Sequence, residues 1–350
     1  MTIRAELRSD NAAAIAPEIL EAIARANSGS SPGYGGDETT ARLNSLVSEV
    51  FEHEAQVFPV TTGTAANALA LSAMAPPWGA VLCHEEAHIL ANEAAATSMF
   101  GGGLALHGLP GVGAKVSPVV VEETLRETPW GDPHNSQPAV LSVTNASEYG
   151  AVYTQGEVGE LAATARRFGV TTHLDGARLA NALAATTSTP ADMTCRAGVS
   201  VLSLGATKNG AMSTDAIVSF DPEVSAQLVY RTKRAGHAAS KMRFHSAQLV
   251  RYLEDGLWLR LAAHANAQMA RLWAGLQEFG LPAVVQPQAN LVFVDLPDGC
   301  ADSLEQAGVA FYRMRGRQVR FVTSFATTDA ELDHALTVIR GHVARDRALG

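Results

Sequence analysis

The chain has 350 residues, of which 47% are hydrophobic and 17% charged, a composition typical of globular proteins with a large apolar core. Its formal net charge of −9, without a long basic run, argues against nucleic acid or an anionic membrane as the main partner. The three cysteines are odd in number and far apart, the first residues hold no apolar leader, and no uncharged apolar stretch reaches about 18 residues. We therefore expect a cytoplasmic protein with no membrane partner.

Strand-like and helix-like segments alternate over residues 56–220. Expected strands are 56–60, 80–83, 104–107, 139–143, 170–174, 199–204 and 216–220, and expected helices between them are 65–74, 89–100 and 160–168. This alternation predicts an α/β fold, in which a mostly parallel mixed sheet is flanked by helices.

The pattern changes near residue 250. Two long amphipathic helices are expected over 248–280, then strands at 290–295 and 319–324 and helices at 303–308 and 329–345. A single core stops growing at roughly 250–300 residues, so a chain of this length favours a division. We predict a large domain over residues 1–250 and a smaller α+β domain over residues 251–350.

The segment Thr61-Thr62-Gly63-Thr64 joins the first of these strands to a helix. Backbone amides at a helix N-terminus, with threonine hydroxyls beside them, form an anion site, and Gly63 allows a phosphate to approach the backbone. Simple helix capping by a threonine is a very common alternative. The segment matches neither a P-loop nor a dinucleotide-binding fingerprint. It is a candidate phosphate site that needs support from other residues.

That support comes from an aspartate and a lysine. Asp175 ends one expected strand, and Lys208 lies in the turn after the next. A carboxylate can pair with the pyridinium nitrogen of pyridoxal phosphate (PLP), and a lysine can form a Schiff base with its aldehyde. A helix cap and a loop lysine are each common, but the ordered combination predicts a PLP enzyme. Arg178 and Arg320 are candidates for binding a substrate carboxylate through paired hydrogen bonds.

The stretch His-Glu-Glu-Ala-His at 84–88 matches the spacing of zinc metallopeptidases. That chemistry needs both histidines on one face of a helix and a third ligand nearby. Here the motif directly follows an expected strand, and Ala91 and Ala94 stand where the extended motif has a glycine and the third ligand. A zinc peptidase stays open as a distant alternative. In a PLP enzyme, His88 could instead stack on the cofactor ring.

Taken together, the motifs resemble the low-specificity L-threonine aldolases, PLP enzymes of the aspartate aminotransferase fold, and within them the phenylserine aldolase-like branch. The resemblance is carried by Leu7-Arg8-Ser9-Asp10, Tyr34-Gly35-Gly36-Asp37, Thr62-Gly63-Thr64-Ala65-Ala66-Asn67, His173-Leu174-Asp175-Gly176-Ala177-Arg178, Gly205-Ala206-Thr207-Lys208-Asn209-Gly210 and Arg320-Phe321-Val322-Thr323-Ser324-Phe325. It therefore spans nearly the whole chain.

The resemblance implies a role for each matching residue. Lys208 would be the Schiff-base lysine and Asp175 the partner of the ring nitrogen. The other cofactor contacts would be Thr62, Gly63, Thr64, His88, Arg178 and Thr207, with Arg243 near the phosphate from a neighbouring subunit. The substrate contacts would be Ser9, Arg178 and Arg320 at its carboxylate, His88 and His134 at its hydroxyl, and Tyr34 from across a dimer interface. No metal ligand is implied.

The implied reaction is reversible retro-aldol cleavage of L-β-hydroxy-α-amino acids (L-threonine, L-allo-threonine, L-phenylserine) to glycine and an aldehyde. His88, His134 or a water held by both would take the hydroxyl proton. An aminotransferase or β-eliminating lyase of the same fold remains an alternative. The family likeness implies homodimers with shared active sites, to which the N-terminal segment contributes, within a homotetramer. The sequence leaves open the preferred aldehyde, the β-carbon configuration, the identity of the base and any monovalent cation.

Overall fold

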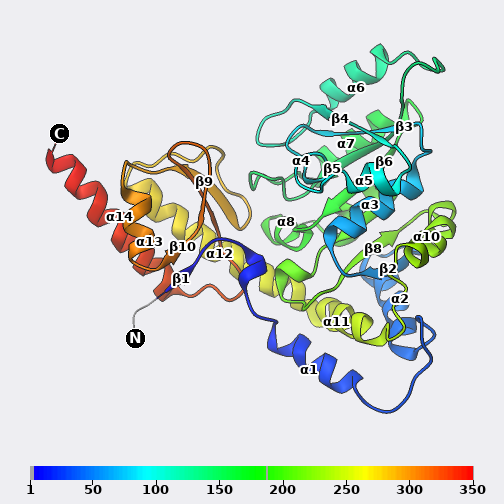
Figure 1. The fold of residues 1–350 in the computed structure, drawn as a ribbon, viewed down its shortest axis with the longest axis horizontal. Coiled ribbons are helices and arrows are strands. Elements are labelled where there is room, and N and C mark those ends of the chain that lie inside the picture. The colour runs from blue at the N-terminus through cyan, green and yellow to red at the C-terminus, as the bar shows by residue number, and fades with distance from the viewer. Residues whose placement is uncertain (1–3, 187, 350) are drawn as a thin grey trace.

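The computed structural model describes residues 4–186 and 188–349, and Figure 1 shows two lobes connected by a long helix. Residues 1–3, on which the expectation about an apolar leader partly rests, lie outside the described residues. The large lobe surrounds a seven-stranded sheet, and the small lobe surrounds a three-stranded one. In the part of the chain that the structure describes, no helix is both long and apolar enough to span a bilayer.

The large sheet has the strand order β2-β8-β7-β6-β5-β3-β4. Its strands are β2 (Gln56–Val60), β3 (Gly79–His84), β4 (Ala105–Leu109), β5 (Gln137–Thr144), β6 (Thr171–Gly176), β7 (Val201–Leu204) and β8 (Asp215–Ser219). The neighbouring strands from β4 to β7 are parallel, and only β8 runs antiparallel to both of its neighbours. The predicted strands and the predicted mostly parallel mixed sheet are confirmed.

Helices cover both faces of this sheet. They are α1 (Pro17–Ala26), α2 (Glu38–Val50), α3 (Gly63–Met74), α4 (His88–Ala91), α5 (Ala96–Phe100), α6 (Pro118–Glu127), α7 (Gln155–Arg166), α8 (Leu179–Ala185), α9 (Pro190–Met193), α10 (Pro222–Arg234) and α11 (Arg243–Leu253). Successive residues of a strand point to opposite faces. In β3, Val81 packs in one cluster with Leu71 of α3, whereas Leu82 packs in another with Leu161 of α7. Both faces are therefore buried, which explains the continuous apolar runs.

The small lobe has its own core. It contains β9 (Leu291–Asp295), β10 (Val309–Ala310), β11 (Tyr312–Arg313), β12 (Gln318–Val322), α13 (Cys300–Gln306) and α14 (Asp329–Leu349), and α12 (Leu257–Glu278) reaches it from the large lobe. The start of α12 packs in the large core through Trp258, and its later turns pack in the small core through Leu272. The division between residues 250 and 251 stays a prediction, since one helix serves both cores.

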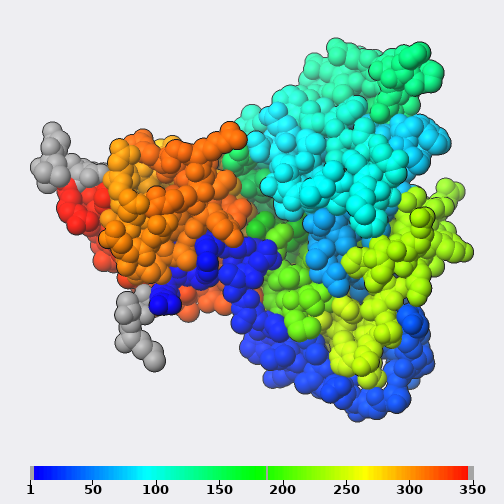
Figure 2. Space-filling view, viewed as in Figure 1, coloured from blue at the N-terminus to red at the C-terminus, as the bar shows by residue number. Residues whose placement is uncertain are grey.

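The N-terminal segment crosses between the lobes (Figure 2). Strand β1 (Ala5–Glu6) pairs with β10, and the Leu7 amide donates to the Ala310 carbonyl at 2.8 Å. Farther along, the Ala16 amide donates to the Gly210 carbonyl at 2.9 Å. The residues between these anchors include the short 3-10 helix η1 (Asp10–Ala12), which is thereby held at the junction of the lobes.

The predicted continuous helix over 89–100 is wrong. The structure has two short helices, α4 and α5, separated by a turn in which Ala94 and Ala95 adopt left-handed φ values of 48° and 59°. Alanine favours a continuous helix, so local propensity does not explain the break. The turn instead accompanies the burial of Glu93, whose carboxylate makes tertiary hydrogen bonds described below.

Candidate active site

A cavity of about 440 Å³ opens where the parallel strands β5, β6 and β7 end, close to the junction of the lobes. Ligands of open α/β sheets bind at this edge, beyond the carboxyl ends of the strands. The predicted site residues that line it are Ser9, Thr62, Gly63, Thr64, His88, Asp175, Arg178, Thr207, Lys208 and Arg320. The fold therefore brings residues from distant parts of the sequence into one site.

The N-terminus of α3 forms one wall of the cavity. Thr62 is its N-cap, and its hydroxyl accepts a hydrogen bond from the Ala65 amide at 3.1 Å. The amides of the first turn have no partner within a helix and attract anions. A Cβ built on Gly63 would meet only the Asp215 carboxylate, at 3.8 Å, so glycine leaves space beside these amides. The capping and anion-binding interpretations of this segment are thus compatible.

Lys208 lies in the 3-10 turn η3 (Thr207–Asn209), which follows β7. Asp215 Oδ1 accepts hydrogen bonds from the amides of Ala206 and Thr207, at 2.8 and 3.0 Å, and fixes the turn. Gly205 is required just before it, because a Cβ there would lie 2.3 Å from the Ala177 carbonyl oxygen. This close approach sets Lys208 beside the end of β6, where Asp175 lies.

Asp175 is only 3% exposed and both of its oxygens are hydrogen-bonded. Oδ2 accepts from Asn67 Nδ2 at 2.9 Å, and Oδ1 accepts from the Ala177 amide at 3.0 Å. Two residues earlier in β6, burial lowers the pKa of His173 to about 4, so this ring is neutral. It bridges Ser142 at 2.9 Å and Ser203 at 3.0 Å. The Asp175 carboxylate is thus held in one orientation, and the nearby hydrogen-bonded group of His173, Ser142 and Ser203 carries no charge.

His88 begins α4 and faces the same cavity. Its ring Nδ1 lies 2.8 Å from Glu93 Oε1, and its backbone amide donates to Glu148 Oε1 at 3.0 Å. Burial raises the pKa of Glu148 to about 7, and the charge of Asp175 contributes to the rise. The cavity therefore holds a histidine between two carboxyl groups, one of which changes charge near neutrality.

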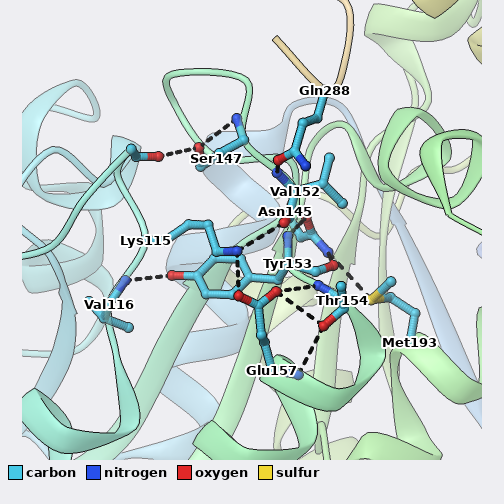
Figure 3. A network of polar contacts seen from close by, with 12 residues as sticks. Lys115, Val116, Asn145, Ser147, Val152, Tyr153, Thr154, Glu157, Met193 and Gln288 are labelled. Carbon is cyan, nitrogen blue, oxygen red and sulfur yellow. Dashed lines mark hydrogen bonds and ion pairs between the residues drawn. The ribbon is translucent and has the colours of Figure 1, made fainter. Parts of the chain in front are cut away.

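The loop that carries Glu148 is anchored by a polar network, shown in Figure 3. Asn145 and Tyr153 exchange two hydrogen bonds of 3.1 Å across the loop, and the Tyr153 hydroxyl accepts from the Val116 amide at 2.6 Å. Lys115 Nζ donates to the Val152 carbonyl at 3.0 Å. These hydrogen bonds fix the conformation of the loop after β5 and therefore the position of Glu148.

Two arginines lie at the small-lobe side of the cavity. Arg178 forms a buried ion pair with Asp10, which also accepts from Asn290 Nδ2 at 3.1 Å. Arg320, on β12, donates to the Arg8 carbonyl at 3.3 Å, and its Nε has no hydrogen-bond partner among the described residues. Burial and the neighbouring Arg178 lower the pKa of Arg320 from its ordinary value. Arg320 therefore has unused donors for an anionic group.

Three predicted site residues lie outside the cavity of their own chain. His134 is in a turn after α6, with its side chain 88% exposed and paired to Asp132. Tyr34 is 65% exposed and lies under Lys233 Nζ. Arg243 starts α11 and donates to the Gly29 carbonyl. His134 does not line the cavity of its own chain, and α6, which precedes its turn, lies at the outer end of the large lobe (Figure 1).

The zinc-peptidase arrangement is not formed. His84 is the last residue of β3, its ring Nδ1 accepts a hydrogen bond from the Glu86 amide, and His88 starts a separate short helix. The two histidines therefore do not share a helix face, which that chemistry requires. The described residues contain no group of three or more histidine, cysteine, aspartate or glutamate side chains placed to hold a metal ion.

Several site residues were missed in the sequence. Asp10 and Asn67 lie inside motifs that predict roles for their neighbours, and Asp215 directly precedes the expected strand 216–220. Glu93 falls in the middle of the expected helix 89–100, and Glu148 follows an expected strand without belonging to any motif. Acidic residues are rarely buried unless they are paired. The single glutamate in the alanine-rich segment around Glu93 was therefore the only sequence feature that could have indicated a functional acid there.

The residues present fit PLP. Buried polar atoms without a partner among the described residues gather in the cavity, namely Thr207 Oγ1, Asn67 Oδ1, Glu93 Oε2 and Glu148 Oε2. Such atoms are uncommon in folded proteins and indicate a missing partner. The α3 N-terminus would hold the phosphate, Asp175 the ring nitrogen and Lys208 the aldehyde carbon.

Comparison with known proteins agrees with this fit. A model of the beta-eliminating lyase family matches residues 6–298. The chain is 38% identical over 338 residues to a low-specificity L-threonine aldolase of Pseudomonas sp. (strain NCIMB 10558), covering 96% of this chain and 97% of that protein. A second such aldolase, from Pseudomonas aeruginosa, is 37% identical over 325 residues, covering 92% and 93%.

Solved structures show the same relationship. A threonine aldolase of Leishmania major superposes with a TM-score of 0.91 at 27% identity, covering 97% of this chain and 99% of that one. A serine palmitoyltransferase of Sphingomonas wittichii superposes with a TM-score of 0.73 at 14% identity, covering 99% and 88%, and shares the fold.

Proposed function

The chain belongs to the beta-eliminating lyase family and is a PLP-dependent carbon–carbon lyase, and on that premise we propose that it cleaves L-threonine to glycine and acetaldehyde. The observation that carries the proposal is one cavity in which Lys208, Asp175 and the N-terminus of α3 meet His88 and two arginines. The first three suit the cofactor, and the others suit the hydroxyl and carboxylate of the substrate.

Different residues of the cavity are expected to bind the cofactor and the substrate. Bound PLP supplies an electron sink for the breaking bond. Asp175 would hold the ring nitrogen through its carboxylate, and Lys208 would hold the aldehyde carbon through its amine. Arg320, supported by Arg178 and Ser9, holds the substrate carboxylate through charge-assisted hydrogen bonds and so orients the Cα–Cβ bond.

The proton of the substrate hydroxyl needs an acceptor. His88 lines the cavity, and proton transfer by a positioned histidine typically contributes about 10²–10⁴-fold to the rate. We assign this role to His88, directly or through a water. His134 is exposed in its own chain, so its predicted contact with the hydroxyl requires a second subunit.

The oligomeric state and location are part of the same proposal. We propose homodimers with shared active sites, assembled into a tetramer, in which Tyr34, Arg243 and His134 reach a neighbouring cavity. Their exposed or half-buried positions outside the cavity of their own chain support this. The three widely spaced cysteines support a cytoplasmic location.

The first experiment is an absorbance spectrum of the purified protein, followed by aldehyde detection with L-threonine, L-allo-threonine or L-phenylserine. We expect the visible band of lysine-bound PLP and acetaldehyde from L-threonine, with the other two substrates also cleaved and the reaction reversible. Amino-group transfer or pyruvate release without aldehyde would instead favour an aminotransferase or a β-elimination. Lys208→Ala should abolish turnover, and near-normal rates in that variant would refute the assignment of Lys208.

A further inference from the structure

Glu93 and His88 form a carboxylate–imidazole pair. The Nδ1–Oε1 distance is 2.8 Å, and the Glu93 side chain is 1% exposed whereas that of His88 is 45% exposed. A carboxylate oxygen accepts hydrogen bonds, so this contact requires the ring proton on Nδ1. No described residue hydrogen-bonds His88 Nε2, and the ring lines the cavity. The pair therefore leaves Nε2 as an acceptor for a substrate.

Glu93 is itself held in place from α3. The two protons of Asn67 Nδ2 go to Glu93 Oε1 at 3.0 Å and to Asp175 Oδ2 at 2.9 Å. One buried amide thus orients both the carboxylate behind His88 and the carboxylate assigned to the ring nitrogen. A bond network of this kind fixes the relative positions of its members more tightly than separate contacts would.

The backbone directly after Glu93 is strained. Ala94 and Ala95, which follow it directly, have φ values of 48° and 59°. Left-handed conformations of residues other than glycine are strained, and they persist where the surrounding structure holds them, often at functional sites. A continuous helix through this alanine-rich segment would avoid that strain, but it would not form the turn in which Glu93 reaches His88 and Asn67.

We propose that Glu93 is a positioning residue that keeps His88 in the Nδ1–H tautomer, with Nε2 free to take the substrate hydroxyl proton. This inference rests on the proposed function. The proton moves from the hydroxyl to Nε2, Nδ1 keeps its own proton, and Glu93 stays a carboxylate beside the resulting imidazolium. The same division of roles makes a histidine an effective base in serine hydrolases.

The tautomer can be measured without any activity assay. Nitrogen NMR of the holoenzyme with ¹⁵N-labelled histidine reports which ring nitrogen carries the proton, and loss of one signal set in His88→Asn assigns His88. We expect a proton on Nδ1, and a proton on Nε2 in the wild-type enzyme would overturn the proposal. If Nδ1–H is found but no aldehyde forms from any substrate, the proposed function fails, and only the assignment of Glu93 as the residue that sets the His88 tautomer stands.

Glu93→Gln tests the consequence for the rate. A glutamine amide can donate to Nδ1 and so move the ring proton to Nε2, which removes the base. We expect kcat to fall by about 100-fold or more while the PLP band and KM stay unchanged. Glu93→Asp should recover part of kcat, and Glu160→Gln, an exposed control on α7, should match the wild type.

Two outcomes of that series would contradict the proposal. One is wild-type kcat in a cofactor-loaded Glu93→Gln enzyme. The other is an equal loss in the Gln and Asp variants with Nδ1–H retained and KM altered, because Glu93 would then only brace the turn. If Glu93→Gln fails to bind PLP, its rate is uninformative and the NMR of the wild-type enzyme tests the proposal instead. A proton on Nδ1 of His88 then supports it, and a proton on Nε2 contradicts it.

Discussion

Arg178 and Asp10 are joined by two hydrogen bonds, 2.7 Å from Nε to Oδ2 and 3.0 Å from Nη2 to Oδ1, in a nearly buried pair. Burial alone would raise the pKa of Asp10, but the charges of Arg178 and Lys208 lower it below its ordinary value. The guanidinium of Arg178 is thus largely occupied by a protein carboxylate. Arg320 is left as the main donor to a substrate carboxylate.

Asp10→Asn should therefore weaken substrate binding and stability together. The variant leaves Arg178 without its charged partner, and removal of one partner from a buried pair costs about 3–5 kcal/mol. We expect a higher KM for L-threonine, a lower kcat/KM and a lower melting temperature. Steady-state kinetics and calorimetry test this, with Asp298→Asn, an exposed aspartate of the small lobe, as the control. An unchanged KM would show that Arg178 needs no such support.

Arg320→Lys should impair substrate binding more strongly than cofactor binding. Lysine keeps the charge but loses the planar pair of donors, and a hydrogen bond to a charged group contributes about 1.5–3 kcal/mol. We expect KM for L-threonine to rise by about 10–100-fold while the PLP band is retained. Arg317→Lys, on the exposed turn before β12, is the matched control. Loss of the PLP band with an unchanged KM would assign Arg320 to the cofactor instead.

Glu148→Gln should change how the cofactor-free protein responds to pH. Burial raises the pKa of Glu148 from 4.5 to about 7, so the folded state favours the protonated form. The associated stability is fully present below pH 4.5 and is lost as the pH rises through about 7. At about pH 8 the ionised form costs at most about 3 kcal/mol, which glutamine avoids.

The melting temperature of Glu148→Gln should therefore exceed that of the wild type at about pH 8 and approach it at about pH 5. Calorimetry of both cofactor-free proteins measures the difference. Glu123→Gln, an exposed glutamate on α6, should show no such pH-dependent gain. A constant difference at both pH values would mean that Glu148 does not titrate in this range.

Subunit mixing tests whether His134 acts in a neighbouring subunit. His134→Ala and Lys208→Ala should each lose most activity. If His134 serves the cavity of another chain, a hybrid of the two variants contains sites with Lys208 from one subunit and His134 from the other. Denaturing and refolding the mixture should then restore part of the wild-type rate. No recovery in confirmed hybrids would remove His134 from the shared site.

Local patterns were sufficient for much of the fold. The strands were predictable because a sheet covered on both faces requires continuous apolar runs, such as Gly79–His84. The break between α4 and α5 was not, because the hydrogen bonds of Glu93 involve Asn67, 26 residues away, and the propensity of alanine opposes the break.

The sequence by itself determined the chemistry of the site. Asp175 lies at the end of β6 and Lys208 in the turn after β7, and these neighbouring parallel strands bring their carboxyl ends to one edge. The threonine-rich turn follows β2 and lines the same cavity. Only the tertiary structure decided which polar side chains hydrogen-bond to one another and which of them face the cavity. It pairs Asp10 with Arg178 across 168 residues, sets Glu93 behind His88, and leaves His134 outside the cavity of its own chain. Such pairings depend on burial and on contacts between distant segments, which leave no regular period in the sequence.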